Sequence, residues 1–346
     1  MAVRSVDGRR TGSALALRES LTPQMRHYEA LGGQRLHLPF VMGFHEPDFV
    51  SPVVTTDGQG FRTTIRSDGR ARVELESFLK VDSASTGVIL GASTAFGVGA
   101  TGDQHSISSV LNRTSHTTWA NFGGRAFNST QEAFLFALYL PQELDHLVVL
   151  SGVNNLTLAY LRADTSPVFN SFFSQEAGAI GVGPSGVRTA FTDLLGALGR
   201  AAQRRLAPKN PIRDLSLQYR HIMACFERDL RVLRDLGRGG GFEVSFVLQP
   251  VATWIDKALS DEEADLFEAL DSLDHQWKHI AAYLLGHKDS YCQNVQEICS
   301  SLSIPFMDLN KEEAFAAETW LFVDRVHLTD EGYRLAAALL KERLGL

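Results

Sequence analysis

Two segments far apart in the chain carry residues that could together form a nucleophilic site. Ser93 follows the short apolar run 87–90 at a Gly-Ala turn, and His327 follows Asp324 by three residues near the C-terminus. A serine hydroxyl is a weak nucleophile until an imidazole accepts its proton, and that imidazole needs a carboxylate that fixes its tautomer and stabilises its charge. The pattern therefore predicts Ser93 as nucleophile, His327 as general base and Asp324 as its orienting partner.

Apolar runs of strand length alternate with segments of helical periodicity, which is typical of a β-α-β arrangement with a parallel sheet. The strand-like runs are 87–90, 117–120, 146–150, 244–248 and 304–307, and the helical segments are 130–140, 215–236, 261–285 and 330–344. Ligands bind at the carboxyl ends of parallel strands, so the residues that follow each run are expected to converge. Those residues are Ser93, Arg125, Ala126, Asn154, Asn155, Gln249, Trp254, Asp324 and His327.

The sequence blocks around Ser93, Gly123, Asn154 and His327, in this order, resemble those of the SGNH (GDSL-like) hydrolase superfamily over residues of roughly 87 to 344. The resemblance implies an α/β fold with three layers, α/β/α, and a five-stranded parallel sheet of the flavodoxin-like SGNH type. It also implies a serine esterase or deacylase that forms an acyl-enzyme on Ser93 without metal or cofactor. The expected substrate is an O- or N-acyl group on a small polar molecule or sugar.

The resemblance assigns the oxyanion hole to the backbone N–H groups of Ser93 and Ala126 and to the side chain of Asn154. Each aligned donor can contribute about 3 kcal/mol to the tetrahedral state. The chain departs from the family pattern at three positions: alanine replaces aspartate at Ala92, alanine replaces glycine at Ala126, and asparagine replaces aspartate at Asn155. An alanine keeps the backbone N–H but not the φ freedom of glycine.

Four residues beside this machinery are predicted to contact the substrate: Arg125, Asn155, Gln249 and Trp254. The planar guanidinium of Arg125 could hold a carboxylate or phosphate, or it could form a salt bridge with a nearby acidic residue. Gln249 and Trp254 could form a wall of the acyl or sugar pocket, and packing in the core is the alternative for Trp254.

Two regions fall outside the strand and helix alternation. Residues 1–80 are predicted to form an N-terminal extension packed on a hydrolase-like domain of residues 81–346. Residues 162–212, rich in glycine, are predicted as an insertion after the third strand. Such an insertion could serve as a lid or substrate loop over the site, or it could be a passive loop or an oligomer contact.

The composition of the chain indicates which partners and which location to expect. A formal charge of -7 gives no basis for nucleic-acid binding. The first 20 residues have no apolar core of a secretory signal, and the uncharged stretch 83–102 contains too much Gly, Ser and Thr to cross a membrane. Three cysteines without a C-x-x-C motif argue against a disulfide framework and a zinc site. A cytoplasmic protein with a small acylated partner is therefore predicted, and the oligomeric state is left open.

Two alternatives to hydrolysis also stay open. A hydroxyl group can intercept the same acyl-enzyme instead of water, which would make the chain an acyltransferase. Because Ala92 lacks the motif carboxylate, the chain could also be a catalytically silent carbohydrate- or metabolite-binding protein. The segment 97–102 matches G-x-G-x-x-G, but six residues separate it from Leu90 and no acidic residue occurs between 104 and 131, so dinucleotide binding is not predicted.

Overall fold

The computed structural model describes residues 13–33, 36–38, 42–66, 72–80, 85–161, 215–273 and 275–346. The predicted insertion at 162–212 lies outside these residues. Among the helices that are described, none combines the length and the apolar character that crossing a membrane would require.

A five-stranded parallel sheet with the order β6-β5-β7-β8-β9 forms the centre of the molecule. Its strands are β5 (Thr86–Gly91), β6 (Thr118–Gly123), β7 (His146–Ser151), β8 (Glu243–Leu248) and β9 (Phe306–Asp308). The chain passes from β5 to β6 on one side and then returns to β7 on the other side of β5, which is the strand order of flavodoxin-like folds. The predicted fold class is confirmed, and the switch point between β5 and β7 is where a ligand site is expected.

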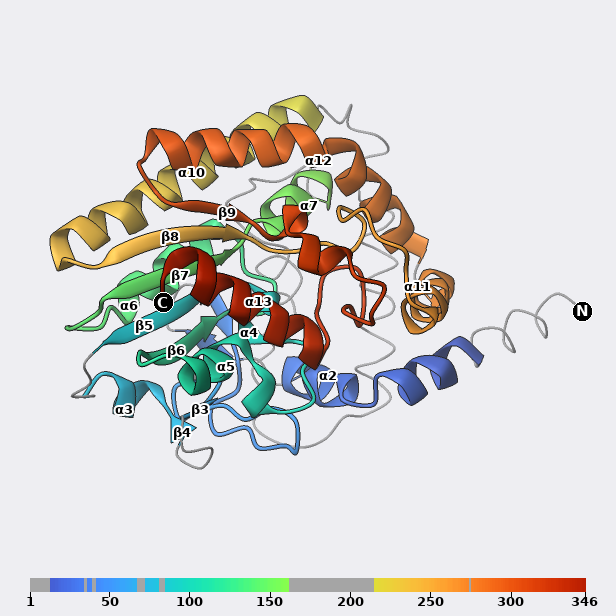
Figure 1. Ribbon diagram of the computed structural model, residues 1–346, viewed down its shortest axis with the longest axis horizontal. Helices are drawn as coiled ribbons and strands as arrows, with labels where there is room; N and C mark the ends of the chain where they lie inside the picture. Colours follow the sequence, from blue (N-terminus) through green and yellow to red (C-terminus); the bar gives the residue numbers. More distant parts are fainter. Residues whose placement is uncertain are drawn as a thin grey trace, which may run out of the picture.

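Helices cover both faces of this sheet (Figure 1). Val88 and Leu90 of β5 belong to one hydrophobic core and Ile89 to the other, because successive side chains of a strand point to opposite faces. One face is covered by α6 (Ser129–Leu138), α7 (Val153–Leu161), α10 (Leu215–Gly240) and α12 (His275–Ser301), and the other by α5 (Ile107–Thr114) and α13 (Asp330–Leu344). Burial on both faces explains why the strands read as continuous apolar runs.

Some boundaries differ from the sequence prediction. The predicted helix 261–285 is two helices, α11 (Asp261–Leu273) and α12, on either side of residue 274. The last strand begins at Phe306, one residue after Pro305, because proline has no N–H to donate to a neighbouring strand. Thr329 is the N-cap of α13, as predicted, and its hydroxyl accepts a hydrogen bond from Gly332 N at 3.2 Å.

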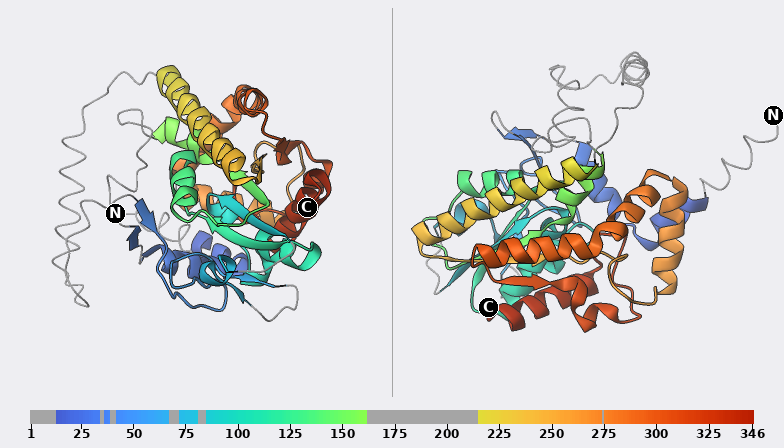
Figure 2. Two further views of the ribbon diagram at one scale, coloured as in Figure 1. Left: turned by 90° about the vertical axis from the view of Figure 1, so that its left-hand side faces the viewer. Right: turned by 90° about the horizontal axis from the view of Figure 1, so that it is seen from above.

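The N-terminal segment consists of short elements. After a helix at residues 13–21, these are α2 (Met25–Gly33), β1 (Leu36–Leu38), β2 (Met42–Phe44), β3 (Thr64–Ile65), β4 (Arg72–Val73) and α3 (Leu75–Phe78). Figure 2 shows the helix 13–21 beside α11, and residues of both line one surface hollow, among them Ala14, Leu17 and Ala269.

The remaining short helices lie in the connections near the carboxyl edge of the sheet. They are α4 (Ser93–Phe96), η1 (Asp103–His105), η2 (Leu309–Lys311) and η3 (Glu313–Ala316).

Candidate active site

The nucleophile turn begins where β5 ends. Gly91 has a φ of 154°, and a Cβ at this position would lie 2.0 Å from Leu150 O of the neighbouring strand, so only glycine fits. Ser93 is the first residue of the single-turn helix α4, which closes at Gly97 in a left-handed conformation with a φ of 93°. The serine is therefore held at the carboxyl end of β5, beside the switch point between β5 and β7.

Ser93 and His327 meet although 234 positions separate them in the sequence. The distance between Ser93 Oγ and His327 Nε2 is 2.7 Å, and the distance between His327 Nδ1 and Asp324 Oδ2 is 2.6 Å. An ionised carboxylate only accepts hydrogen bonds, so Nδ1 carries the proton and Nε2 is the acceptor for the serine hydroxyl. This arrangement can activate the serine as a nucleophile.

The loop between β9 and α13 presents the base. An antiparallel bridge between Phe322 and Leu328 closes it. Asp324 Oδ1 accepts hydrogen bonds from the backbone N–H groups of Val326 at 2.9 Å and His327 at 2.8 Å. Burial raises the pKa of Asp324, but the charge and hydrogen bond of His327 and these two N–H groups lower it more, so the net pKa is below the ordinary value. The carboxylate therefore stays ionised beside the imidazole.

Thr94 joins the nucleophile turn to the loop of the base. Its hydroxyl donates to Val326 O at 3.1 Å and accepts from Gln249 Nε2 at 2.8 Å. Three loops at the carboxyl edge are thus tied together one residue from Ser93. Sequence reasoning missed Thr94, because its only signal was its position beside the nucleophile.

Ala126 and Asn154 are the remaining donors of the predicted oxyanion hole. Ala126 has a φ of 62°, the left-handed region that glycine adopts without a Cβ penalty. Asn154, the second residue of α7, donates from Nδ2 to Phe127 O at 2.8 Å, which joins the loop after β7 to the loop after β6. Ala126 thus adopts a backbone conformation that favours glycine.

The four predicted substrate contacts are all engaged within the protein. Gln249 and Trp254 are buried, and the Trp254 indole donates to Leu284 O at 3.1 Å. Asn155 is buried too: its Oδ1 accepts from Ser129 N and its Nδ2 donates to Ser129 Oγ. The side chains of Gln249, Trp254 and Asn155 thus turn into the protein and brace the loops around the site, and their contact with a substrate stays a prediction.

Arg125 also bonds to the protein. Its Nη1 donates to Tyr28 O at 2.7 Å, and its backbone N–H donates to His45 Nε2 at 3.2 Å. Its side chain thus reaches the N-terminal segment, and its contact with a substrate anion stays a prediction. Within the described ranges, no group of three or more His, Cys, Asp or Glu side chains is placed to hold a metal ion.

No protein-family model matches the chain, and no curated protein matches it. Several solved structures match the chain. A mutant of an acetyl-xylooligosaccharide esterase from Geobacillus is 13% identical, covers 77% of this chain and 97% of its own, and has a TM-score of 0.42. An extracellular lipase from Streptomyces rimosus is 14% identical over 75% of this chain and 99% of its own, with a TM-score of 0.39.

A third solved structure, from Desulfitobacterium hafniense, is described as a lipolytic protein of the G-D-S-L family. It is 11% identical over 75% of this chain and 98% of its own, with a TM-score of 0.39. Several matching structures are described as GDSL-like lipases or esterases. At such identities these names say nothing of the substrate of this chain.

Proposed function

We propose that this protein is a serine hydrolase of the esterase or deacylase type that forms an acyl-enzyme on Ser93. The observation that carries the proposal is the continuous hydrogen-bonded chain from Ser93 Oγ to His327 to Asp324, with distances of 2.7 Å and 2.6 Å. These distances lie within the range required for proton transfer from a nucleophile to its base. Ser93 also lies at the carboxyl end of β5, beside the switch point between β5 and β7, where the fold is expected to bind ligands.

The geometry supports a two-step reaction. Ser93 Oγ attacks the substrate carbonyl carbon while His327 Nε2 takes the hydroxyl proton, and Asp324 stabilises the imidazolium. The tetrahedral intermediate then expels the alcohol or amine, which receives that proton from Nε2. Water attacks the acyl-enzyme with Nε2 as its base, and the acid leaves while the proton returns to Ser93.

The negative charge of the tetrahedral state needs donors in place before the reaction. We assign this role to the N–H groups of Ser93 and Ala126 and to the amide of Asn154, as the family resemblance implies. The left-handed φ of 62° at Ala126 supports the assignment, because the loop keeps the conformation of a glycine-containing turn. Cytoplasmic placement and a small acylated partner stay predictions from the sequence.

A small fluorophosphonate tests the proposal without knowledge of the substrate. We expect stoichiometric labelling of the wild-type protein at Ser93, measured by intact-protein mass spectrometry and peptide mapping. Ser93→Ala and His327→Ala should abolish labelling. Ser301→Ala is the matched control, because this hydroxyl lies on the exposed side of α12 and donates to Ile298 O. A folded wild-type protein that takes up no label would refute an activated serine.

A further inference from the structure

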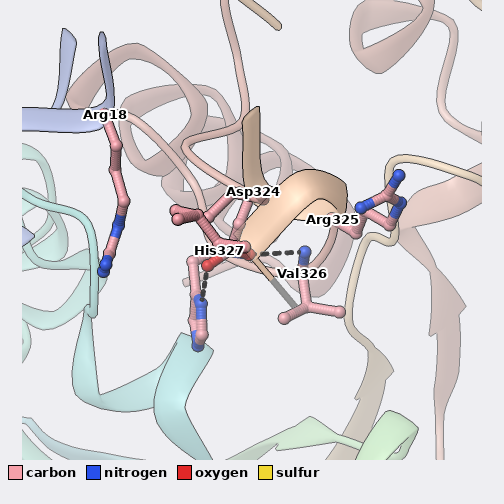
Figure 3. Close-up of a pocket in the computed structure, with 7 residues that line it drawn as sticks. Arg18, Asp324, Arg325, Val326 and His327 are labelled. Atoms are coloured by element: carbon pink, nitrogen blue, oxygen red, sulfur yellow. Dashed lines mark hydrogen bonds and ion pairs between the residues drawn. The ribbon is translucent and has the colours of Figure 1, made fainter. Parts of the chain in front are cut away.

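A cavity of about 270 Å³ adjoins the base of the proposed triad. Three segments form it: the helix 13–21 contributes Arg18, the end of α11 contributes Leu270 and Leu273, and the loop before α13 contributes Val326 and His327. Figure 3 shows Arg18, Arg325, Val326 and His327 around Asp324. The cavity is thus built by parts of the chain that lie outside the parallel sheet.

The chemistry of His327 determines which half of the substrate this cavity faces. The same Nε2 atom that removes the serine proton must deliver it to the leaving oxygen, so that oxygen comes within hydrogen-bond reach of Nε2. The alcohol half of an ester therefore lies on the His327 side of Ser93. Since His327 is one wall of the cavity, we propose that the cavity binds the alcohol half of the substrate and that Arg18 selects an alcohol carrying a negatively charged group.

The two arginines of the cavity differ in how firmly they are held. Arg325 forms an ion pair with Asp271 at 2.8 Å, and its guanidinium lies 5.2 Å from the centre of the Phe267 ring. In Figure 3 the side chains of Arg18 and Arg325 lie on opposite sides of Asp324 and His327. Arg325 therefore holds α11 against the loop that carries His327.

Arg18 pairs instead with Glu29, whose side chain is 57% exposed. An ion pair with a solvent-exposed partner contributes little to stability, so a substrate anion can replace Glu29 at little cost. Both oxygens of Asp324, a carboxylate of the cavity wall, already accept hydrogen bonds from the loop of the base. The charge of Arg18 is thus available to a ligand, and a guanidinium binds carboxylate or phosphate with two parallel hydrogen bonds.

The other residues of the wall indicate that the carbon skeleton of the alcohol is apolar. Leu270, Leu273 and Val326 are apolar and would leave the hydroxyl groups of a bare sugar ring without partners. An aromatic or short alkyl body fits such walls better. The inferred substrate, which rests on the proposed esterase function, is an ester whose alcohol half combines an apolar body with a carboxylate or phosphate.

A matched pair of esters tests this selectivity. We compare 4-acetoxybenzoate with 4-acetoxybenzamide, which differ in charge but hardly in shape, and divide each kcat/KM by the rate of hydrolysis in hydroxide alone. We expect wild type to favour the carboxylate by about tenfold, the order of one charge-assisted hydrogen bond. Arg18→Gln should remove the preference and Glu29→Gln should increase it. Arg26→Gln, which changes the net charge equally from an exposed position on α2, should leave it unchanged.

A binding measurement separates this inference from the hydrolase proposal. In the Ser93→Ala background we titrate 4-hydroxybenzoate, 4-hydroxyphenyl phosphate and 4-hydroxybenzamide by calorimetry, and the ratio of the first two affinities shows which anion is preferred. We expect both anions to bind about tenfold more tightly than the amide, and Arg18→Gln to abolish the difference. Equal binding of all three, or a preference that survives Arg18→Gln, would overturn the inference. Ester hydrolysis without charge preference would overturn it and leave the hydrolase proposal standing, whereas anion binding without any hydrolysis would do the reverse.

Discussion

The carboxyl group of Glu132 is buried in the interior of the molecule beneath the site. Ser151, the last residue of β7, donates a hydrogen bond to Glu132 Oε1 at 2.5 Å. Burial raises the pKa of Glu132 to about 8; the Ser151 hydrogen bond opposes this rise and the charge of Asp229 adds to it. The folded protein therefore keeps a proton on this carboxyl at neutral pH, next to the strand that leads into Asn154.

This proton makes stability depend on pH. In the unfolded chain Glu132 loses the proton near its ordinary pKa of 4.5, whereas the folded chain keeps it up to about pH 8. Between these values the unfolded state binds fewer protons, so Glu132 makes the free energy of unfolding fall as pH rises, by up to about 1.4 kcal/mol per pH unit. Glu132→Gln keeps the acceptor for Ser151 and removes the titration. We expect wild type to lose stability relative to this variant across the window.

Urea denaturation at several pH values between about 5 and about 8 measures the difference. Glu76→Gln is the control, because this carboxylate is exposed on α3 and pairs with Lys80. A difference between wild type and Glu132→Gln that stays constant with pH would show that the carboxyl is ionised in the folded state.

At the scale of elements, the bond between Thr94 and the loop of the base aligns Ser93 with His327, which lies 234 positions further along the chain. Thr94→Val keeps the shape of the side chain but removes the donor to Val326 O and the acceptor for Gln249. A shift of about 1 Å between nucleophile and base can lower the rate by about a hundredfold. We expect Thr94→Val to reduce kcat for 4-nitrophenyl acetate by about tenfold to a hundredfold, with KM little changed.

Thr94→Ser retains the hydroxyl and should restore most of kcat, while circular dichroism checks that both variants are folded. Full activity of Thr94→Val would show that the loops are aligned without this bond. Equal losses in the Val and Ser variants would indicate that the methyl group matters for packing instead.

The sequence predicts which residues lie at the carboxyl edge of the sheet, but not where all of their side chains point. The apolar runs and the rule that ligands bind at the carboxyl ends of strands indicate which residues reach that edge of the sheet. They do not indicate side-chain direction: Gln249, Asn155 and Trp254 follow their strands as predicted, but the burial of all three side chains could not be predicted. Ser93 and His327 differ, because a tight glycine turn and a loop with its own carboxylate limit where their side chains can point.

The contribution of residues 162–212 to the site was predicted only as a lid or a loop, and it stays open, since those residues lie outside the described part of the chain. The cavity beside His327 could not be predicted at all. Its walls come from the helix 13–21 and from α11, and the sequence carries no signal that these two helices meet.

At the scale of the whole molecule, Arg62 fastens the N-terminal segment to the sheet domain. Its guanidinium is fully buried: Nε binds Asp103 Oδ1 at 3.0 Å and Nη1 donates to Gly97 O at 2.8 Å. Tyr28 OH donates to the same carbonyl at 2.9 Å, and Asp103 also accepts from the Thr55 hydroxyl at 2.5 Å. The segment and the chain just after Ser93 therefore share one polar network.

Removing Arg62 should weaken the molecule as one unit. Arg62→Met leaves Asp103 buried without its cation, which costs about 3–5 kcal/mol of the free energy of unfolding in comparable buried pairs. Adding Asp103→Asn should return part of that loss, because the uncompensated charge disappears while the amide oxygen can still accept the bond from Thr55 N. Arg334→Met is the control: its pair with Glu331 is exposed on both sides, so we expect a loss within about 1 kcal/mol.

Urea unfolding followed both by tryptophan fluorescence and by hydrogen exchange of residues 42–66 distinguishes one unit from two. Trp119 and Trp254 are buried in the sheet domain and report its unfolding. A network shared through Arg62 predicts that both signals change together in wild type and shift together in Arg62→Met. If hydrogen exchange of 42–66 rises in Arg62→Met while the tryptophan transition stays in place, the N-terminal segment unfolds by itself. In that case the nucleophile turn keeps its shape through Thr94 and the sheet alone, and labelling of Ser93 in the same variant would persist.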